Sequence, residues 1–246
     1  MSTTAKDIKN NNMIIDIWSD IMCPFCYIGK RKFENALHKF SKKDKVHVVW
    51  KSFDLAPHME TNTDINIYEF LSVFKSIPMP EVKNLTAHVT NMAKDAGLDF
   101  NFDTTVAAKT KKAHQLMHLA ITHNLQNELK EALLKAYFID GKNIDDIETL
   151  IVLGTSIGLK TKEIKDTFEN EKFLKAISDD IQEAKNLGIQ GIPYFVFNKK
   201  YGVSGAQHES TFLDILEKSY TDWERLQEHN IIEVIQGDHC DVDGNC

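Results

Sequence analysis

Three apolar runs interrupt an otherwise amphipathic chain. They are MIIDIWS (13–19), KVHVVWKSF (45–53) and YFVF (194–197), each short and rich in β-branched or aromatic residues. Runs of this length and composition predict strands. The second run is apolar on both faces, so we expect it at the centre of a sheet. The third run and the segment YGVS (201–204) flank NKK, which predicts a β-hairpin.

The segment between the second and third runs has a helical pattern almost throughout. From about 64 to 187, apolar residues recur three and four positions apart, without strand signals or internal repeats. Asp145 or Asp146 is a suitable N-cap for one of these helices, and Gly158 is a suitable end for it. We therefore expect an all-helical block in the middle of the chain.

Helical spacing also follows the first run and the hairpin. Phe33, Ala36 and Phe40 predict a helix that ends near residue 41, and Phe212 and Leu216 predict another. Strands at both ends that share one sheet predict an α/β fold interrupted by a large all-helical insertion domain. The expected segments are a disordered N-terminal tail (1–12), a sheet domain (13–62 and 188–220), the helical insertion (63–187) and a C-terminal extension (221–246).

Composition and charge narrow the range of partners. The 246 residues are 42% hydrophobic and 26% charged, as in ordinary globular proteins. A net charge of −7 argues against nucleic-acid and anionic-membrane surfaces, which need clustered cations. No run is long enough for a transmembrane helix, and the polar start MSTTAKDIKNNN lacks the apolar core of a secretory signal. We expect a cytoplasmic protein with neither a membrane nor a nucleic-acid partner.

The candidate chemistry lies in CPFC, where the first strand meets the first helix. Cys23 and Cys26 stand three positions apart, and Pro24 is suited to the first helical position. The N–H groups and the dipole of a helix N-terminus stabilise a thiolate, which is the reactive form of cysteine. We therefore expect Cys23 to be an exposed nucleophile and Cys26, one turn further on, to be a more buried resolving thiol. Such a dithiol uses no cofactor.

The other two cysteines, Cys240 and Cys246, leave alternatives open. With Cys23 and Cys26, or with His239 in place of one, they supply four zinc ligands for a non-catalytic interaction module, although structural zinc sites usually use a second tight pair. Otherwise they are idle thiols, a small structural loop or an auxiliary redox pair. The turn formers in DVDGN favour the auxiliary pair, because they let the chain fold back. Our interpretation is a redox centre without a metal.

Four other titratable residues bear on this centre. His114 and His118 are spaced as zinc ligands on a helix, but HQLMH has no glutamate and both residues flank the polar face, so we expect solvated histidines. Asp20 precedes CPFC, and we expect it to cap the helix or to be solvated. Asp16 lies within the first strand, and the pattern does not assign its face.

SDIMCPFCYIGK, followed much later by GIQGIPYFVFNKKYGVSGAQ, resembles the DsbA family of thioredoxin-fold proteins. In particular it is similar to the FrnE-like branch, whose members share the motif C-P-[WF]-C-[YF]-x-G. The central KAHQLMHLAI and LKEALLKAYFIDGKNIDD also look like that family's helical insertion, so the likeness covers residues 13–220. It implies a thioredoxin-like fold with an inserted helical domain. It also implies thiol–disulfide exchange, as an oxidoreductase or isomerase acting on protein or small-thiol disulfides.

The resemblance also assigns roles to residues. The CPFC cysteines match the family's active pair, and Pro193 matches the proline that is cis in thioredoxin folds, which leaves the Ile192 backbone free to pair with substrate. Pro24 and Phe25 complete the implied substrate-binding set. Phe25 stands where the periplasmic oxidases carry histidine, which favours an isomerase or reductase over a strong oxidant. The related glutathione-dependent isomerases and transferases, an alternative that would take glutathione as co-substrate, carry serine at the reactive position, so two cysteines favour disulfide exchange.

Overall fold

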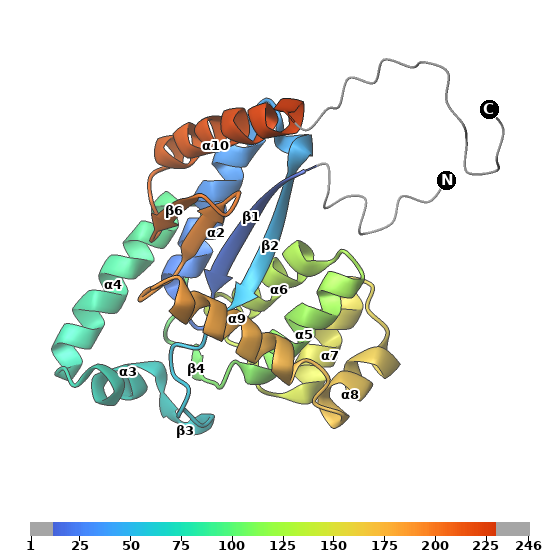
Figure 1. Ribbon diagram of the computed structural model, residues 1–246. Coiled ribbons are helices and arrows are strands. Elements are labelled where there is room, and N and C mark those ends of the chain that lie inside the picture. Colours follow the sequence, from blue (N-terminus) through green and yellow to red (C-terminus); the bar gives the residue numbers. More distant parts are fainter. Residues whose placement is uncertain (1–11, 230–246) are drawn as a thin grey trace, which may run out of the picture.

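The computed structural model describes residues 12–229 and places four strands in one sheet (Figure 1). They are β1 (Met13–Ser19), β2 (Val46–Ser52), β5 (Tyr194–Phe197) and β6 (Tyr201–Ser204). The sheet order is β2-β1-β5-β6, with β1 parallel to β2 and the other neighbours antiparallel. The predicted strands and hairpin are confirmed. The expected central place of 45–53 is wrong, because β1 is central and β2 forms an edge.

Alternation along β1 divides its side chains between two layers of helix. The covering helices are α2 (Pro24–Lys39), α9 (Leu174–Asn186) and α10 (Glu209–His229). Ile15 and Ile17 are fully buried in the main core, where Phe33 of α2 lies 5.5 Å from Phe195 of β5 between ring centroids. On the other face, Trp18 packs in a second cluster with Ala184 of α9. Figure 1 shows α9 beside the C-terminal ends of β1 and β2, where CPFC begins.

Most of the chain between β2 and α9 is helical. Its elements are β3 (Asn62–Asn66), α3 (Ile67–Lys75), α4 (Met79–Asp95), β4 (Val106–Ala107), α5 (Lys111–Thr122), α6 (Gln126–Phe138), α7 (Ile147–Ser156) and α8 (Thr161–Glu169), and the short 3-10 helix η1 (Lys43–Lys45) precedes β2. Asp146 caps α7 by accepting a hydrogen bond from the Thr149 N–H at 2.8 Å, and Gly158 follows with a positive φ of 103°. The mixed α/β fold class is confirmed.

A short ladder between β3 and β4 is the one feature of this segment that contradicts the expected pattern of helices alone. The two strands pair antiparallel, with Asn62 opposite Ala107 and Asn66 opposite Val106. The sequence of β3, NTDIN, has no apolar alternation and lies mostly exposed. Its extended form therefore comes from pairing with β4 rather than from its own pattern.

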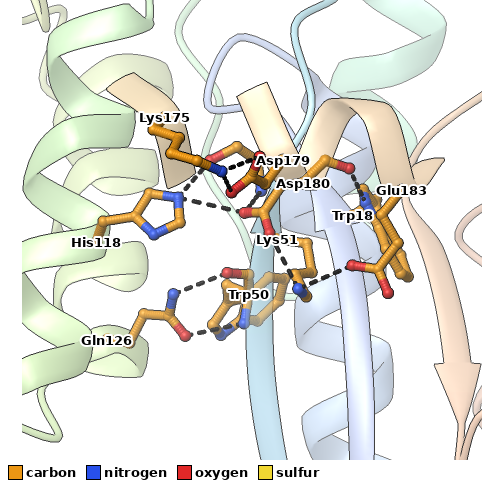
Figure 2. Close-up of polar contacts among 10 residues, drawn as sticks. Trp18, Trp50, Lys51, His118, Gln126, Lys175, Asp179, Asp180 and Glu183 are labelled. Carbon is orange, nitrogen blue, oxygen red and sulfur yellow. Dashed lines mark hydrogen bonds and ion pairs between the residues drawn. The ribbon is translucent and has the colours of Figure 1, made fainter. Parts of the chain in front are cut away.

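Side chains, rather than another strand, close the outer edge of β2. Gln126 at the start of α6 accepts a hydrogen bond from the Trp50 N–H (2.9 Å) and donates one to the Trp50 carbonyl (2.8 Å). Asp180 of α9 accepts a hydrogen bond from the Ser52 N–H at 2.9 Å. Figure 2 shows Gln126 and Asp180 against this edge, with His118 pointing toward Asp180. Because helices cover β2, this edge strand is as apolar as a central one.

The helix after the hairpin is longer than its apolar stripe predicts. α10 continues beyond residue 220 to His229, and Tyr220 and Trp223 are buried, with ring centroids 5.3 Å apart. Tyr220 also packs edge-on against Phe40, at a centroid distance of 5.6 Å. The segment that we expected to be an extension from 221 therefore begins inside a helix that belongs to the core.

Some predictions fall outside residues 12–229. Cys240, Cys246 and the alternative zinc ligand His239 lie there, as do residues 1–11 of the expected N-terminal tail. Within the described range, none of the helices is long and apolar enough to cross a membrane.

Candidate active site

The two CPFC cysteines lie where β1 leaves the sheet and α2 begins, as the sequence predicts. Cys23 is the N-cap of α2, with an extended backbone (φ −89°, ψ 113°), and Pro24 follows in the first turn, where a missing N–H costs nothing. The Cys26 N–H donates to the Cys23 carbonyl at 3.0 Å. No described side chain caps the helix. Its first N–H groups can therefore stabilise a negative charge on the Cys23 sulfur.

An apolar pocket of about 310 Å³ ends at Cys23. The CPFC segment, α3, α4 and the loop before β5 form its walls, and the lining includes Pro24, Phe25 and Ile192 but not Cys26. Cys23 is only 4% exposed and Cys26 is 0% exposed. The expectation of an exposed Cys23 is therefore wrong. Helices α3 and α4 form walls around Cys23 and shield it from solvent. The CPFC segment alone would leave this sulfur exposed.

The loop before β5 holds a carbonyl group beside the first sulfur. Cys23 Sγ lies 3.7 Å from the Ile192 carbonyl oxygen, within reach of an S–H···O hydrogen bond. The Ile192–Pro193 peptide bond is cis. A Cβ atom at Gly29 would lie only 2.9 Å from Pro193 Cγ, so the absence of a side chain at position 29 allows this loop to approach α2. Pro193 thus packs against α2 rather than lining the pocket.

The two thiols do not ionise alike. Their mutual hydrogen bond and burial both raise the pKa of Cys23. Burial opposes ionisation of Cys26 as well, but the hydrogen bond from Cys23 and the charge of Lys130 lower the pKa of Cys26. In the reduced pair the negative charge therefore favours Cys26, whereas helix position alone assigned it to Cys23. The interaction between the two sulfurs thus places the proton on Cys23 and the charge on Cys26.

Asp20, three residues before Cys23, is completely buried and neither caps α2 nor contacts solvent. Its carboxylate accepts a hydrogen bond from the Leu55 N–H at 2.9 Å and pairs with His114 Nε2 at 3.2 Å. Burial alone would raise the pKa of Asp20, but the hydrogen bond and charge of His114 lower it below its ordinary value. The charge of this carboxylate adds to the raised pKa of Cys23.

Both histidines of α5 are buried, so the expectation of solvated side chains is wrong. His114 is 3% exposed and His118 is 8% exposed. Their positions flank the polar face of a helical wheel, but every residue of α5 from 113 to 120 is buried. Each histidine therefore meets a carboxylate from outside α5. His114 meets Asp20 at the end of β1, and His118 Nε2 lies 3.2 Å from the Asp180 carboxylate on α9.

Asp16 lies on the far face of the sheet from the dithiol. It is two positions from Trp18 in β1 and so shares that residue's face, which α9 covers. Burial raises the pKa of Asp16, and the charges that act on it come from Lys51 and Glu183 among others, not from either cysteine. Asp16 is therefore not the proton acceptor of the dithiol.

Two residues of α6, Lys130 and Tyr137, face the centre although the sequence analysis did not single them out. Lys130 is 1% exposed, and its Nζ lies 5.5 Å from the centroid of the Trp50 ring. Burial lowers the pKa of Lys130, against the opposing effect of the charge on Cys26. Tyr137 is also 1% exposed and lines the Cys23 pocket. Both residues share a helix face with the apolar Leu133, and that spacing carries the signal for their burial.

The part of the chain from 12 to 229 contains no group of three or more Cys, His, Asp or Glu side chains that could hold a metal ion. The zinc alternative also requires Cys240 and Cys246, which lie beyond it. The auxiliary redox role of these two cysteines likewise stays a prediction.

Known proteins resemble this chain over most of its length. The sequence model of a family described as DSBA-like thioredoxin domain matches residues 14–217. The probable DsbA oxidoreductase SCO1869 from Streptomyces coelicolor is 30% identical, with a TM-score of 0.79 over 95% of this chain and 98% of that one. The uncharacterized protein YwbO of Bacillus subtilis is 26% identical over 211 residues, which cover 85% of this chain and 96% of YwbO.

A more distant likeness concerns the fold alone. The cytosolic disulfide reductase DsbM from Pseudomonas aeruginosa, in a structure with GSH, is 15% identical, with a TM-score of 0.59 over 87% of this chain and 99% of that one. The predicted thioredoxin-like fold and the predicted DsbA family are confirmed, while the FrnE-like branch stays a prediction. The chain belongs to the family of DSBA-like thioredoxin domains.

Proposed function

We propose that this protein is a thiol–disulfide oxidoreductase whose exchange centre is the Cys23–Cys26 dithiol. The observation that carries the proposal is the arrangement of the two sulfurs. Cys23 ends an apolar pocket large enough for part of a substrate, and Cys26 is sealed behind it. A pocket that admits substrate to one sulfur alone supports different roles for the two cysteines.

The exchange proceeds in two steps. The proton moves from Cys23 to Cys26 across their hydrogen bond, and the Cys23 thiolate attacks a substrate disulfide, forming a mixed disulfide and releasing one substrate thiolate. Cys26 then loses its proton to solvent and attacks the Cys23 sulfur, which releases the second substrate thiolate and leaves a Cys23–Cys26 disulfide. The dithiol loses two electrons and the substrate disulfide gains them. The nearby Ile192 carbonyl supports an extended substrate backbone beside Cys23.

The surroundings of Cys23 favour reduction or isomerisation of substrates over strong oxidation. A dithiol becomes a strong oxidant in its disulfide form when its reduced thiolate is well stabilised. Here the hydrogen bond with Cys26 and burial raise the pKa of Cys23, and the charge of Asp20 adds to the rise. The neighbour within the motif is Phe25, which brings no polar group to the sulfur. The reduced pair is stabilised at Cys26 but not at Cys23, so we expect a weaker oxidant than a dithiol whose first cysteine is a stable thiolate.

The first prediction separates the roles of the two cysteines. Cys23→Ser should abolish reduction of insulin disulfides in the presence of dithiothreitol, because no other cysteine lines the pocket. Cys26→Ser should accumulate mixed disulfides with substrate, visible by mass spectrometry, because the resolving thiol is lost. A Cys23→Ser variant that kept most of its activity would rule out the proposed centre.

A matched control removes the same number of thiols elsewhere. The double variant Cys240→Ser, Cys246→Ser should retain turnover if Cys23 and Cys26 are sufficient for exchange. Loss of turnover at an unchanged melting temperature would instead assign an auxiliary redox role to the C-terminal pair.

A further inference from the structure

Tyr137 brings an unpaired hydroxyl group into the pocket that ends at Cys23. The residue lies in the last turn of α6 and is 1% exposed, with its ring 4.8 Å from that of Phe138 between centroids. It lines the same pocket as Cys23. Its hydroxyl makes no hydrogen bond to any residue between 12 and 229. The hydroxyl is not among the fully enclosed polar atoms of the described residues that lack a partner, so it is open to the pocket and free to bond a molecule there.

The other hydroxyl groups of the pocket wall are already engaged. Thr86 Oγ1 donates to the Val82 carbonyl at 3.0 Å, and Thr105 Oγ1 donates to the Asn101 carbonyl at 3.0 Å. The one ammonium group in the lining belongs to Lys75, which is exposed at the end of α3. Within the enclosed part of the pocket, Tyr137 is therefore the hydroxyl donor that remains available to a bound molecule.

Tyr137 lines the same pocket as Cys23, and its surroundings keep its proton in place. Burial, and then the charge of Asp20, raise the pKa of Tyr137. The same carboxylate acts on Cys23, and the Cys23 N–H donates to the Asp20 carbonyl at 3.3 Å. The charge of Asp20 thus acts on both residues. A phenol with a raised pKa stays protonated, so it can donate a hydrogen bond but does not readily give up its proton.

We propose that the Tyr137 hydroxyl donates a hydrogen bond to the substrate sulfur that is displaced when Cys23 attacks. The proposal rests on the proposed function. As the bond between Cys23 and the first substrate sulfur forms, the substrate S–S bond breaks and its electron pair goes to the second sulfur. This thiolate forms in an apolar pocket, where an unsolvated charge is costly. The hydrogen bond from Tyr137 stabilises it, and the thiolate takes its proton from solvent after it leaves.

The test is Tyr137→Phe, which removes one oxygen atom and keeps the ring. The value of kcat/KM for disulfide exchange should fall about tenfold or more, because a hydrogen bond to a charged group is lost in the transition state. The melting temperature should stay the same or rise, because the hydroxyl has no partner within the protein. Tyr220→Phe, in a buried tyrosine of α10 outside the pocket, is the matched control and should leave kcat/KM unchanged.

A second measurement varies the leaving group. Bis(2-hydroxyethyl) disulfide releases a basic alkyl thiolate, which gains more from a hydrogen bond than the acidic aromatic thiolate released by Ellman's reagent. Tyr137→Phe should therefore slow exchange more with the alkyl probe, after both rates are divided by those of free dithiothreitol. Equal kcat/KM for wild type and Tyr137→Phe with both probes would overturn the role of Tyr137 and leave the proposed function intact. Undiminished exchange by Cys23→Ser would overturn the proposed function itself.

Discussion

Lys130 places a cation beside the resolving thiol although it forms no ion pair with a residue of the described range. It is 1% exposed, and its ammonium group faces the Trp50 ring. Burial lowers the pKa of Lys130, while its positive charge is among the causes that lower the pKa of Cys26. A buried cation that is not paired with a carboxylate costs stability. The cation lies where the proposed second step of exchange needs a thiolate.

Lys130→Met should test this role while nearly preserving the shape of the side chain. Without the cation the pKa of Cys26 rises, so release of substrate from the mixed disulfide should slow several-fold at pH 7 and recover at higher pH. The melting temperature should not fall, because the ammonium group has no carboxylate to lose. Stopped-flow measurement of the release rate against pH checks the slower release and its recovery, and thermal unfolding checks the melting temperature.

The matched control is Lys32→Met, a lysine of α2 that donates to the Ala206 carbonyl and is not among the main causes of the pKa shifts of the thiols. An unchanged pH profile in Lys130→Met, or the same change in Lys32→Met, would contradict the assignment.

For single residues, the sequence identifies the reacting groups but not their surroundings. Cys23, Cys26 and Pro24 are assigned by a motif whose spacing and helix start are local. The burial of Cys23 depends on α3 and α4, and the partners of Asp20 and His114 come from segments far along the chain. Asp20 and His114 pair with each other across the core. A local pattern can assign a residue to the polar face of a helix, but it cannot show a partner from a distant segment.

Among the helices, α6 both binds the edge of β2 and carries two residues of the candidate site. Its first residue, Gln126, holds both the N–H and the carbonyl group of Trp50 with its side-chain amide. The amide takes the place of a neighbouring strand, and Asn127 adds a hydrogen bond from the Trp50 indole at 3.2 Å. The same helix carries Lys130, whose charge acts on Cys26, and Tyr137, which lines the Cys23 pocket. Alignment of α6 against β2 thus positions both groups.

Gln126→Ala should destabilise the protein by about 1–3 kcal/mol, because two buried backbone groups of Trp50 lose their partners. Urea unfolding measures this loss. The matched control is Gln182→Ala on α9, where the amide donates only to exposed Asn186 and removal should change stability by less than about 0.5 kcal/mol. Equal effects of the two substitutions would show that the Gln126 amide does not stabilise the edge of β2.

The place of β2 in the sheet could not be predicted for the same reason. A strand that is apolar on both faces is typical of a sheet interior. The apolar run along 45–53 reports burial, and burial here comes from α6 and α9 rather than from strands on both sides. Conversely, β1 and the hairpin were predicted because their signals, an apolar run and a three-residue turn, are local.

For the molecule as a whole, two buried histidine–carboxylate contacts hold α5 against the end of β1 and against α9. His114 and His118, one turn apart on α5, reach Asp20 at the end of β1 and Asp180 on α9. Asp180 also accepts a hydrogen bond from Lys51 at 3.0 Å, and Figure 2 shows it at the centre of these contacts. Together these contacts fix α5 against the edge where the dithiol lies.

The pKa values of these carboxylates predict sensitivity to acid. Burial alone would raise the pKa of Asp180, but hydrogen bonds from His118 and the Ser52 N–H, with the charge of Lys51, lower it below its ordinary value of 3.8. A depressed pKa stabilises the folded state above the unfolded value, and this stability is lost as pH falls through the folded value. The melting temperature should therefore fall steeply below about pH 4.

Asp180→Asn should remove part of that dependence. The variant should melt roughly 5–10 °C lower at pH 7, because His118 and Lys51 lose a buried partner. Its melting temperature should then change less between pH 5 and pH 3 than that of the wild type. Asp179→Asn, which alters the adjacent exposed carboxylate paired with Lys175, serves as the control and should behave like the wild type. Parallel pH curves for all three proteins would refute this account.

The closed edge of β2 also governs how copies of this chain can associate. An unpaired strand edge is a template for a strand of another molecule, and so for aggregation during synthesis or at high concentration. With Gln126 and Asp180 occupying the backbone of β2, the only other edge of the described four-stranded sheet is β6. That strand is four residues long, and the Tyr194 ring packs over its Gly202. Growth of the sheet from one copy to the next is thereby limited to one short strand.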